Sequence, residues 1–402
     1  MSSPVLPGFH ELPSAFGGTT SLTPPSPPPA PSRRRGGLWA ALAALLLLAL
    51  LAAGAQFWAN VRYDEAAAAF STASADARAA HDDLRRELGS SQDMLDAAAS
   101  VRAEDTGLLS TAEARDGLAA ALEAAESATA AAEEAASAPL PPIPDKPIWA
   151  WELFTGAEDL DQQAAAVSQR SERLRSTAED LGIAAGAVDD ALEEVFRTAS
   201  GAIADFEAGH LSARNADIIE LRLAHDDLLA RPSPSDSLTA QAFARLNAAA
   251  SAVVASHDEV LAGKSGPLLQ RRLQVEEYAR SLAGGVILDF EWERIVNGRG
   301  LNGSAGGLAV WNSGHGGHST ITLSDSVAEY WPSPVMRALV AHEVGHAISA
   351  KCYAMFDWED RDANEEWATA WAISQGHTSE GNGVSIYGYP RQEIIDRART
   401  CR

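Results

Sequence analysis

The hydrophobic positions of the chain follow three different patterns along its length. An uninterrupted apolar run covers residues 38–58, and apolar residues recur at intervals of three and four within the region 60–282. From about residue 285, short β-branched runs alternate with glycine-rich turns. These patterns are typical of a membrane-spanning helix, of amphipathic helices and of short strands, respectively. We therefore expect a transmembrane helix, then a mainly α-helical region, then a smaller α+β domain.

The apolar run has the length and the flanks of a transmembrane helix. Its 21 residues carry no charge, and ~20 apolar residues suffice to cross the hydrocarbon core. Trp39 and Trp58 stand at its two ends, where aromatic rings favour the membrane interface, and the arginines at 33–35 form a positive flank that stays in the cytoplasm. The pattern predicts a single-pass anchor in the cell membrane at residues 37–59, with a cytoplasmic N-terminus and an extracytoplasmic C-terminal domain.

A cleaved signal peptide is the alternative to a retained anchor. Ala53-Gly54-Ala55 resembles a cleavage site, whereas the long polar leader and the long apolar run favour the anchor. Both alternatives export everything after residue 60. Residues 1–36 are rich in proline and serine and too poor in apolar residues to form a core, which predicts a disordered cytoplasmic tail.

The charge of the chain bears on its partners. The formal net charge of −24 argues against binding to nucleic acid and against attraction to anionic lipid. Membrane association is thus expected through the apolar anchor rather than through surface charge.

The region between the anchor and the α+β domain is expected to be helical. Residues 60–137 are alanine-rich and contain no proline, which favours helix. Prolines make 138–148 a linker, and a second helical region follows at 149–284, with an interruption at 231–234. This composition predicts a bundle or coiled coil that spaces or docks the C-terminal part, through a protein partner or self-association.

The α+β domain is expected at residues 285–402. Strands are predicted at 286–288, 308–311 and 320–323, separated by glycine-rich turns. A helix is then predicted to begin with Ser333 as the N-cap and Pro334 at the first helical position.

The predicted helix after Pro334 carries the strongest chemical signal. His342 and His346 are four residues apart and share one helix face, so their imidazoles can grip one metal ion. Glu343 lies beside the metal in this HEXXH arrangement, where it can act as general base toward a water molecule that Zn²⁺ makes acidic. Gly345 leaves room for close packing.

A catalytic zinc needs a third protein ligand and an open position. Glu365 lies 19 residues after His346 on another predicted helix, for which Asp362 or Asn364 is an available cap. The adjacent Glu366 is the alternative ligand. Glu365 is favoured because Ala368 and Ala372 then follow it along one stripe of the helix.

The pair of segments 342–346 and 364–365 resembles the gluzincin metallopeptidases, the thermolysin-like branch of the zincins, and the domain size suggests minimal members. The resemblance implies a zincin-like fold, zinc bound by His342, His346 and Glu365, and Glu343 as the catalytic base. It also implies that 320–324 is the edge strand to which an extended peptide substrate is added. Thr369 departs from the family, which has at that position an aspartate that hydrogen-bonds a zinc-binding histidine.

Several residues remain candidates for other roles. His377, Tyr387 and Tyr389 are candidate transition-state donors. His315 and His318 suggest a second metal site, but exposed loop histidines are the favoured interpretation. Cys352 and Cys401 are expected to form a disulfide in an exported domain, which would tie the C-terminal tail to the end of the metal helix.

Two functions are consistent with these features. The first is a membrane-anchored extracytoplasmic zinc metallopeptidase that hydrolyses a peptide or protein substrate. The alternative is an envelope scaffold or interaction protein, in which the helical ectodomain is the working part and the zincin-like domain is inactive.

Overall fold

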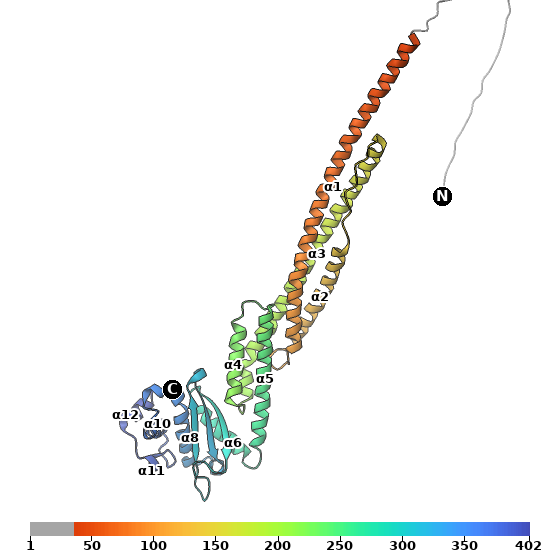
Figure 1. Ribbon diagram of the computed structural model, residues 1–402. Helices are drawn as coiled ribbons and strands as arrows, with labels where there is room; N and C mark the ends of the chain where they lie inside the picture. Colours follow the sequence, from red (N-terminus) through yellow and green to blue (C-terminus); the bar gives the residue numbers. More distant parts are fainter. Residues whose placement is uncertain (1–35) are drawn as a thin grey trace, which may run out of the picture. The chain divides into compact units, whose positions relative to one another are not determined.

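A computed structural model describes residues 36–402, so the predicted cytoplasmic tail lies outside the described residues. The described chain is mostly helical, with one small mixed sheet in its C-terminal part (Figure 1). It divides into two compact units. The first comprises the described residues up to 68 together with 144–160, and the second comprises 69–143 together with 161–402.

The apolar run belongs to a long helix, α1 (Gly36–Glu104), which is long and apolar enough to cross a membrane. Its leucines are largely exposed, as a lipid-facing segment requires. The first buried side chains of α1, Ala59 and Tyr63, follow directly after the run. The helix is continuous at this point, so the change from an exposed to a partly buried helix involves no break in the backbone.

The alanine-rich part of the helical region has a break that the sequence did not predict. Continuous helix was expected over 60–137, but α1 ends at Glu104 and α2 (Ala112–Ser137) begins eight residues later. The expectation was wrong because the break needs no proline. The Asp105 carboxylate accepts hydrogen bonds from the Gly107 N–H (2.8 Å) and the Ser110 hydroxyl (2.6 Å), and Gly107 takes a left-handed φ of 71°.

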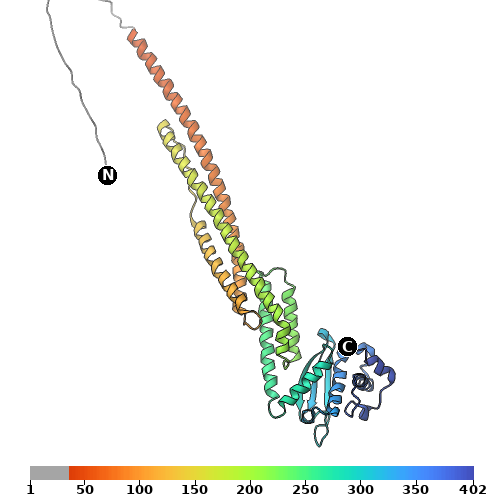
Figure 2. The same ribbon diagram turned by 180° about the vertical axis from the view of Figure 1, so that it is seen from behind.

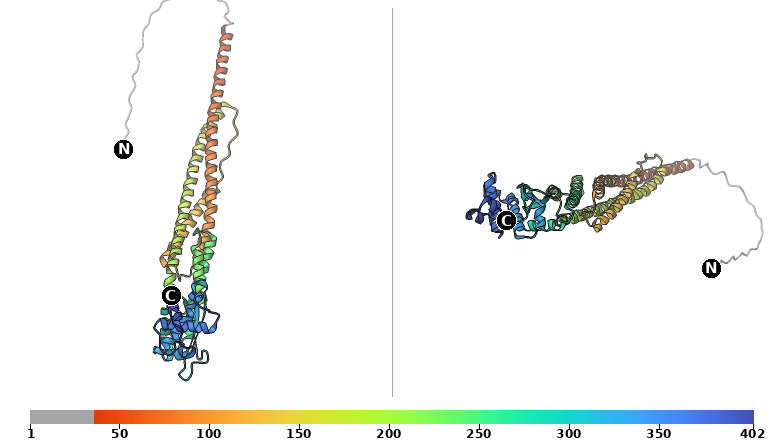
Figure 3. Two further views of the ribbon diagram at one scale, coloured as in Figure 1. Left: turned by 90° about the vertical axis from the view of Figure 1, so that its left-hand side faces the viewer. Right: turned by 90° about the horizontal axis from the view of Figure 1, so that it is seen from below.

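The rest of the helical region is built around α3 (Ala150–Gly209), α4 (Asn215–Leu229) and α5 (Ser237–Gly263). Within the second unit, buried residues of α3 recur at intervals of three and four, which is the spacing of helices that pack along one seam. They are Leu181, Ala185, Val188, Leu192, Val195 and Ala199. The two views of Figure 3 show α4 and α5 beside the end of α3. The predicted interruption at 231–234 is present, and further breaks occur at 210–214 and 264–268.

The three predicted strands are present as β1 (Ile287–Glu293), β2 (Gly307–Asn312) and β3 (His318–Ser324). Their order is β1-β3-β2, with β3 parallel to β1 and antiparallel to β2. The expectation that 320–324 is the edge strand was therefore wrong. A short turn folds β2 back onto β3, and β1 occupies the other side of β3, so β2 is left at the edge.

Helices cover the sheet. Residues of α8 (Pro334–Ala347) pack on one face together with α6 (Leu269–Leu282), and α10 (Arg361–Ser374) and α12 (Gln392–Ala398) lie beyond α8 (Figure 2). The short helices of this part are α7 (Asp325–Glu329), α9 (Ser349–Cys352) and α11 (Val384–Tyr387), with 3₁₀ turns at Gly314–Gly316 and Tyr353–Met355. A disulfide joins Cys352 and Cys401, with 6.1 Å between their Cα atoms.

A buried ion pair joins the end of α5 to α6. Lys264, which follows α5, places its ammonium 2.9 Å from the Glu276 carboxylate of α6, and both side chains are almost fully buried. The Trp292 indole N–H of β1 donates to the same carboxylate (2.9 Å). Burial lowers the pKa of Lys264, and the attraction of Glu276 opposes this shift. The buried ammonium and carboxylate therefore stay charged only because each has the other as its partner.

We predict that Glu276→Ala lowers the free energy of unfolding by about 3–5 kcal/mol, because it leaves the Lys264 charge buried without its carboxylate partner. The free energy of unfolding of the full chain in urea measures the effect. Glu277→Ala, which alters the exposed neighbouring residue on α6, is the matched control and should leave the unfolding transition unchanged. Equal stability of the two variants would contradict the prediction.

Candidate metal centre

The helix that carries the two histidines begins as predicted. Ser333 caps α8 by accepting a hydrogen bond from the Met336 N–H (3.4 Å), and Pro334 occupies the first turn. Gly345 lies against α10, where a Cβ atom would come within 2.7 Å of the Ala368 carbonyl oxygen. The absence of a side chain at Gly345 thus allows α8 and α10 to approach closely enough for residues on both helices to face one another.

The second helix begins earlier than predicted. Asp360, rather than Asp362 or Asn364, is the N-cap of α10, and its carboxylate accepts from the Ala363 N–H (2.8 Å). Asn364 consequently lies in the first turn of the helix. From there its side chain contacts His346 instead of capping the backbone.

Three potential ligand atoms converge between α8 and α10. The Nε2 atoms of His342 and His346 are 3.2 Å apart, and Glu365 Oε2 lies 3.2 Å from the first and 3.3 Å from the second. Within residues 36–402, this is the group of histidine, cysteine and acidic side chains whose geometry could hold a metal ion. Two of its members come from one helix and the third from the other.

The other ring nitrogens determine which tautomer each histidine adopts. His342 Nδ1 lies 3.1 Å from the Asn382 carbonyl oxygen, and His346 Nδ1 lies 2.8 Å from Asn364 Oδ1. Both partner atoms are carbonyl oxygens, which accept hydrogen bonds, so each Nδ1 carries a proton and donates it. In the neutral imidazoles both Nε2 atoms then present lone pairs toward each other and toward the Glu365 carboxylate, an arrangement that only a cation can satisfy.

The spacing of the three atoms fits zinc. With Zn–N and Zn–O distances of about 2.0 Å, the corners of a tetrahedron are about 3.3 Å apart. The three measured separations of 3.2–3.3 Å match this edge. Two imidazoles and one carboxylate are also a usual protein donor set for a catalytic zinc.

The charges of these groups depend on one another. Burial raises the pKa of Glu365, but hydrogen bonds that the two imidazoles donate from Nε2 in their doubly protonated form outweigh burial and hold this pKa well below its usual range. For His346 burial lowers the pKa, while the hydrogen bond to Glu365 and the nearby carboxylates produce a net increase. The Glu365 carboxylate is therefore anionic and favours a positive charge beside it.

Glu343 lies beside these atoms and not among them. Its side chain is buried, and burial raises the pKa of its carboxyl group, with Glu365 adding to the increase and the two histidines opposing it. Gly307 of β2 passes so close that a Cβ atom there would collide with the Glu343 carboxylate. Glu343 lines a cavity of about 340 Å³ together with His342, His346 and Glu365.

The alternative ligand Glu366 points elsewhere. It accepts hydrogen bonds from the Arg391 backbone N–H (3.0 Å) and guanidinium (2.8 and 2.9 Å). These contacts lower the pKa of Glu366 and occupy both of its carboxylate oxygens. Glu366 therefore attaches the segment before α12 to α10.

The candidate hydrogen-bond donors and the candidate second-site histidines lie in different surroundings. Tyr387 lines the cavity, with its ring parallel to that of His342 at 5.9 Å, whereas His377 Nε2 lies 2.9 Å from the Tyr278 hydroxyl. Tyr389 is largely exposed and lines a neighbouring cavity. His315 lies in the turn before β3 and His318 begins that strand.

Thr369 is a minor partner of His342. Its hydroxyl lies 3.4 Å from His342 Nδ1, farther than the Asn382 carbonyl oxygen at 3.1 Å. Gly383, with a φ of 96°, lets this loop approach, because a Cβ atom there would lie 2.8–2.9 Å from the His342 ring. The sequence did not identify Asn382 and Gly383 as neighbours of His342. A contact through a backbone carbonyl leaves no residue-type signal, and an Asn-Gly pair by itself is typical only of a turn.

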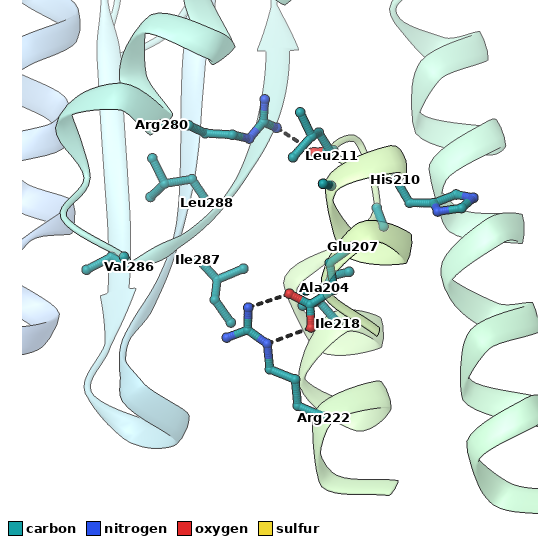
Figure 4. A pocket seen from close by; sticks show the side chains of 13 residues that line it. Ala204, Glu207, His210, Leu211, Ile218, Arg222, Arg280, Val286, Ile287 and Leu288 are labelled. Atoms are coloured by element: carbon teal, nitrogen blue, oxygen red, sulfur yellow. Dashed lines mark hydrogen bonds and ion pairs between the residues drawn. The ribbon is translucent and has the colours of Figure 1, made fainter. Parts of the chain in front are cut away.

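A second cavity of about 330 Å³ lies between the helical region and the sheet (Figure 4). Its charged side chains are engaged within the protein. Arg222 makes two hydrogen bonds to the Glu207 carboxylate (2.8 and 2.5 Å), and Arg280 donates to the Leu211 carbonyl oxygen (2.5 Å). These contacts join α4 to α3, and α6 to the segment between α3 and α4, so the cavity lies at a structural contact.

Comparison of the chain with protein-family models, with curated proteins and with solved structures found no match. The chemistry of the site is accordingly inferred from its own geometry.

We predict that the full chain, purified without chelators, contains stoichiometric zinc and that Glu365→Ala loses it, because one of three converging ligands is removed. Glu366→Ala is the matched control and should retain the metal, since Glu366 pairs with Arg391. Elemental analysis by mass spectrometry measures both. Metal-free wild-type protein, or equal zinc in both variants, would contradict the assignment.

A second prediction concerns the carbonyl beside His342. Gly383→Ala should weaken zinc binding by roughly 10- to 100-fold, the usual effect of disturbing a partner of a ligand histidine. Gly388→Ala is the control, because Gly388 also has a positive φ (87°) but a Cβ atom there meets no atom within 4 Å. Competition with a chelator measures the two affinities. The prediction fails if both variants hold zinc equally well.

Proposed function

We propose that the chain is a membrane-anchored zinc metallopeptidase of the gluzincin kind, acting outside the cytoplasm on a peptide or protein substrate. The observation that carries the proposal is the convergence of His342, His346 and Glu365 in a cavity that Glu343 also lines. A structural zinc site is closed, with four protein ligands. Three ligands together with a buried acid beside them fit a site that acts on a substrate.

His342, His346 and Glu365 would hold the zinc ion, which supplies Lewis acidity toward a carbonyl oxygen and lowers the pKa of water. Glu343 would accept a proton from the attacking water and deliver it to the leaving amine. Burial raises the pKa of this carboxyl group, which strengthens it as a base. Gly307 confines the carboxylate to the side of the cavity that adjoins β2.

Tyr387 is the best-placed donor for an oxygen atom that gains negative charge during the reaction. Burial, and then the neighbouring Glu365 and Glu343, raise the pKa of Tyr387 to about 12. The phenol therefore keeps its proton at neutral pH and can donate a hydrogen bond. His377 and Tyr389 are not needed for this role.

The edge strand β2 offers a place for an extended substrate. The Ser324 N–H donates to the Gly306 carbonyl oxygen (2.9 Å), which marks this pair as hydrogen-bonded. Along an antiparallel pair of strands, hydrogen-bonded and non-hydrogen-bonded positions alternate. Ala309 and Trp311 are therefore at positions whose backbone N–H and C=O groups point away from β3. Both residues also line the cavity. A peptide added as a further strand would thus pass directly beside Glu343.

The proposed location is supported by α1, which is long and apolar enough to cross a membrane. The arginines at 33–35 favour a cytoplasmic N-terminus. We propose that α1 is retained as a single-pass anchor in the cell membrane and that everything after it is extracytoplasmic.

The decisive experiment is the activity of Glu343→Gln. Amide nitrogen and oxygen cannot take up the proton, so hydrolysis of a quenched fluorescent peptide library by the full chain should fall by roughly 10²- to 10⁴-fold. Zinc content should stay at the wild-type level, because Glu343 is not among the converging atoms. Loss of zinc in this variant would mean that the residue has a structural role instead.

The competing function, an interaction scaffold, gives a different result. If zinc-loaded wild-type protein and Glu343→Gln are equally inactive, and deletion of residues 62–283 removes the cellular phenotype while Glu343→Gln preserves it, the helical region is the working part.

A further inference from the structure

A group of exposed apolar side chains stands where α3 begins. Ile148, Trp149 and Trp151 are 78%, 56% and 64% exposed, and the two indole rings stack at 5.2 Å with an interplanar angle of 6°. We call these three residues the tryptophan patch. Contiguous apolar groups of this kind usually mark a surface that contacts a partner or a membrane.

The tryptophan patch lies beside the end of the apolar run of α1. Gln56 Nε2 donates to the Ile148 carbonyl oxygen (2.8 Å), and the ring of Trp58 lies 5.6 Å from that of Phe154 in the first turns of α3. Figure 1 shows the start of α3 alongside α1 at this point. All of these residues belong to the first compact unit, which includes 144–160.

The linker before the patch is attached to the same helix. The Tyr63 hydroxyl donates to the Asp145 carbonyl oxygen (3.4 Å), and Lys146 forms an ion pair with Asp64 (2.7 Å). Asp64 is six residues beyond Trp58, or about 9 Å farther along the helix axis. The contacts of the linker with α1 thus pass from a charged pair to an apolar cluster as they approach the apolar run.

We propose that the tryptophan patch inserts into the interface of the membrane that α1 spans and forms a second lipid contact. This inference rests on the membrane anchor in the proposed function. If the run 38–58 fills the hydrocarbon core, Trp58 marks its outer boundary, and Gln56 holds Ile148 at the same level. Indole rings favour this zone, because their apolar body and N–H group suit its mixed polarity.

The depth of insertion is limited by a charge. Glu152 follows Trp151 directly, in the first turn of α3. Its carboxylate has to remain hydrated, so the patch enters the headgroup level and not the hydrocarbon core. The lipid is expected to be neutral, since the chain has a formal net charge of −24.

Labelling at single cysteines tests the inference on the full chain. Both native cysteines are joined in the disulfide, so an introduced thiol is the reactive one. Trp151→Cys and Ile148→Cys would carry an environment-sensitive fluorophore in phosphatidylcholine vesicles that contain spin-labelled lipid. Ile183→Cys is the matched control, since Ile183 is 65% exposed on the same helix but far from the membrane end. Leu46→Cys reports on the anchor itself.

We expect a several-fold larger quenching by spin-labelled lipid at positions 148 and 151 than at 183, together with protection from aqueous iodide. Strong quenching at 46 with none at 148 and 151 would overturn the inference while leaving the anchor intact. Absence of quenching at 46 as well would overturn both. A disulfide-linked dimer of Trp151→Cys in place of lipid quenching would assign the patch to a second copy of the chain and also overturn the inference.

Discussion

The close approach of α8 and α10 is the constraint on which the candidate site depends. Gly345 faces Ala368 at a distance that admits no side chain, and this contact sets the separation between the histidines of one helix and Glu365 of the other. A larger residue at Gly345 would push the helices apart, and ligand atoms that need spacing near 3.3 Å would no longer converge. The buried Trp367 and Trp371 of α10 share one hydrophobic core with Val340 and Val344 of α8.

Packing alone would leave the imidazole rings free to turn. Their orientation depends on two acceptors outside the ligand set, the Asn382 carbonyl and the Asn364 side chain. In the gluzincins, which the site segments resemble, an aspartate accepts a hydrogen bond from one zinc-binding histidine. Here that position holds Thr369, and the Asn382 carbonyl oxygen is the nearer partner of His342 Nδ1. A neutral acceptor fixes the tautomer as well as a carboxylate does, but it adds no negative charge to the site.

The sequence predicted those parts of the site that depend on local spacing. His342 and His346 share a helix face by periodicity alone, and Ser333 and Pro334 marked the start of that helix. It did not predict contacts that depend on the path of a distant loop, such as Asn382 beside His342. Sheet order was missed for a similar reason. The residues of β3 have a strand pattern, but nothing in that pattern distinguishes a central from an edge position. The position depends on β3 lying between β1 and β2 in the folded sheet. The cap of α10 was placed too late, because Asp360, Asp362 and Asn364 are all good capping residues.

The disulfide has a consequence for the order in which the molecule matures. Its two cysteines enclose the chain from 352 to 401, so Glu365, Asn382 and Tyr387 lie within a covalent ring while both histidines lie outside it. A metal ion held by all three ligands would therefore connect the linear part of the chain to the part that the disulfide closes into a ring. The cyclised half also packs on α8 through the buried Trp367 and Trp371. If the proposed extracytoplasmic location holds, this ring closes only after export, and the covalent frame of the centre is completed away from the place of synthesis.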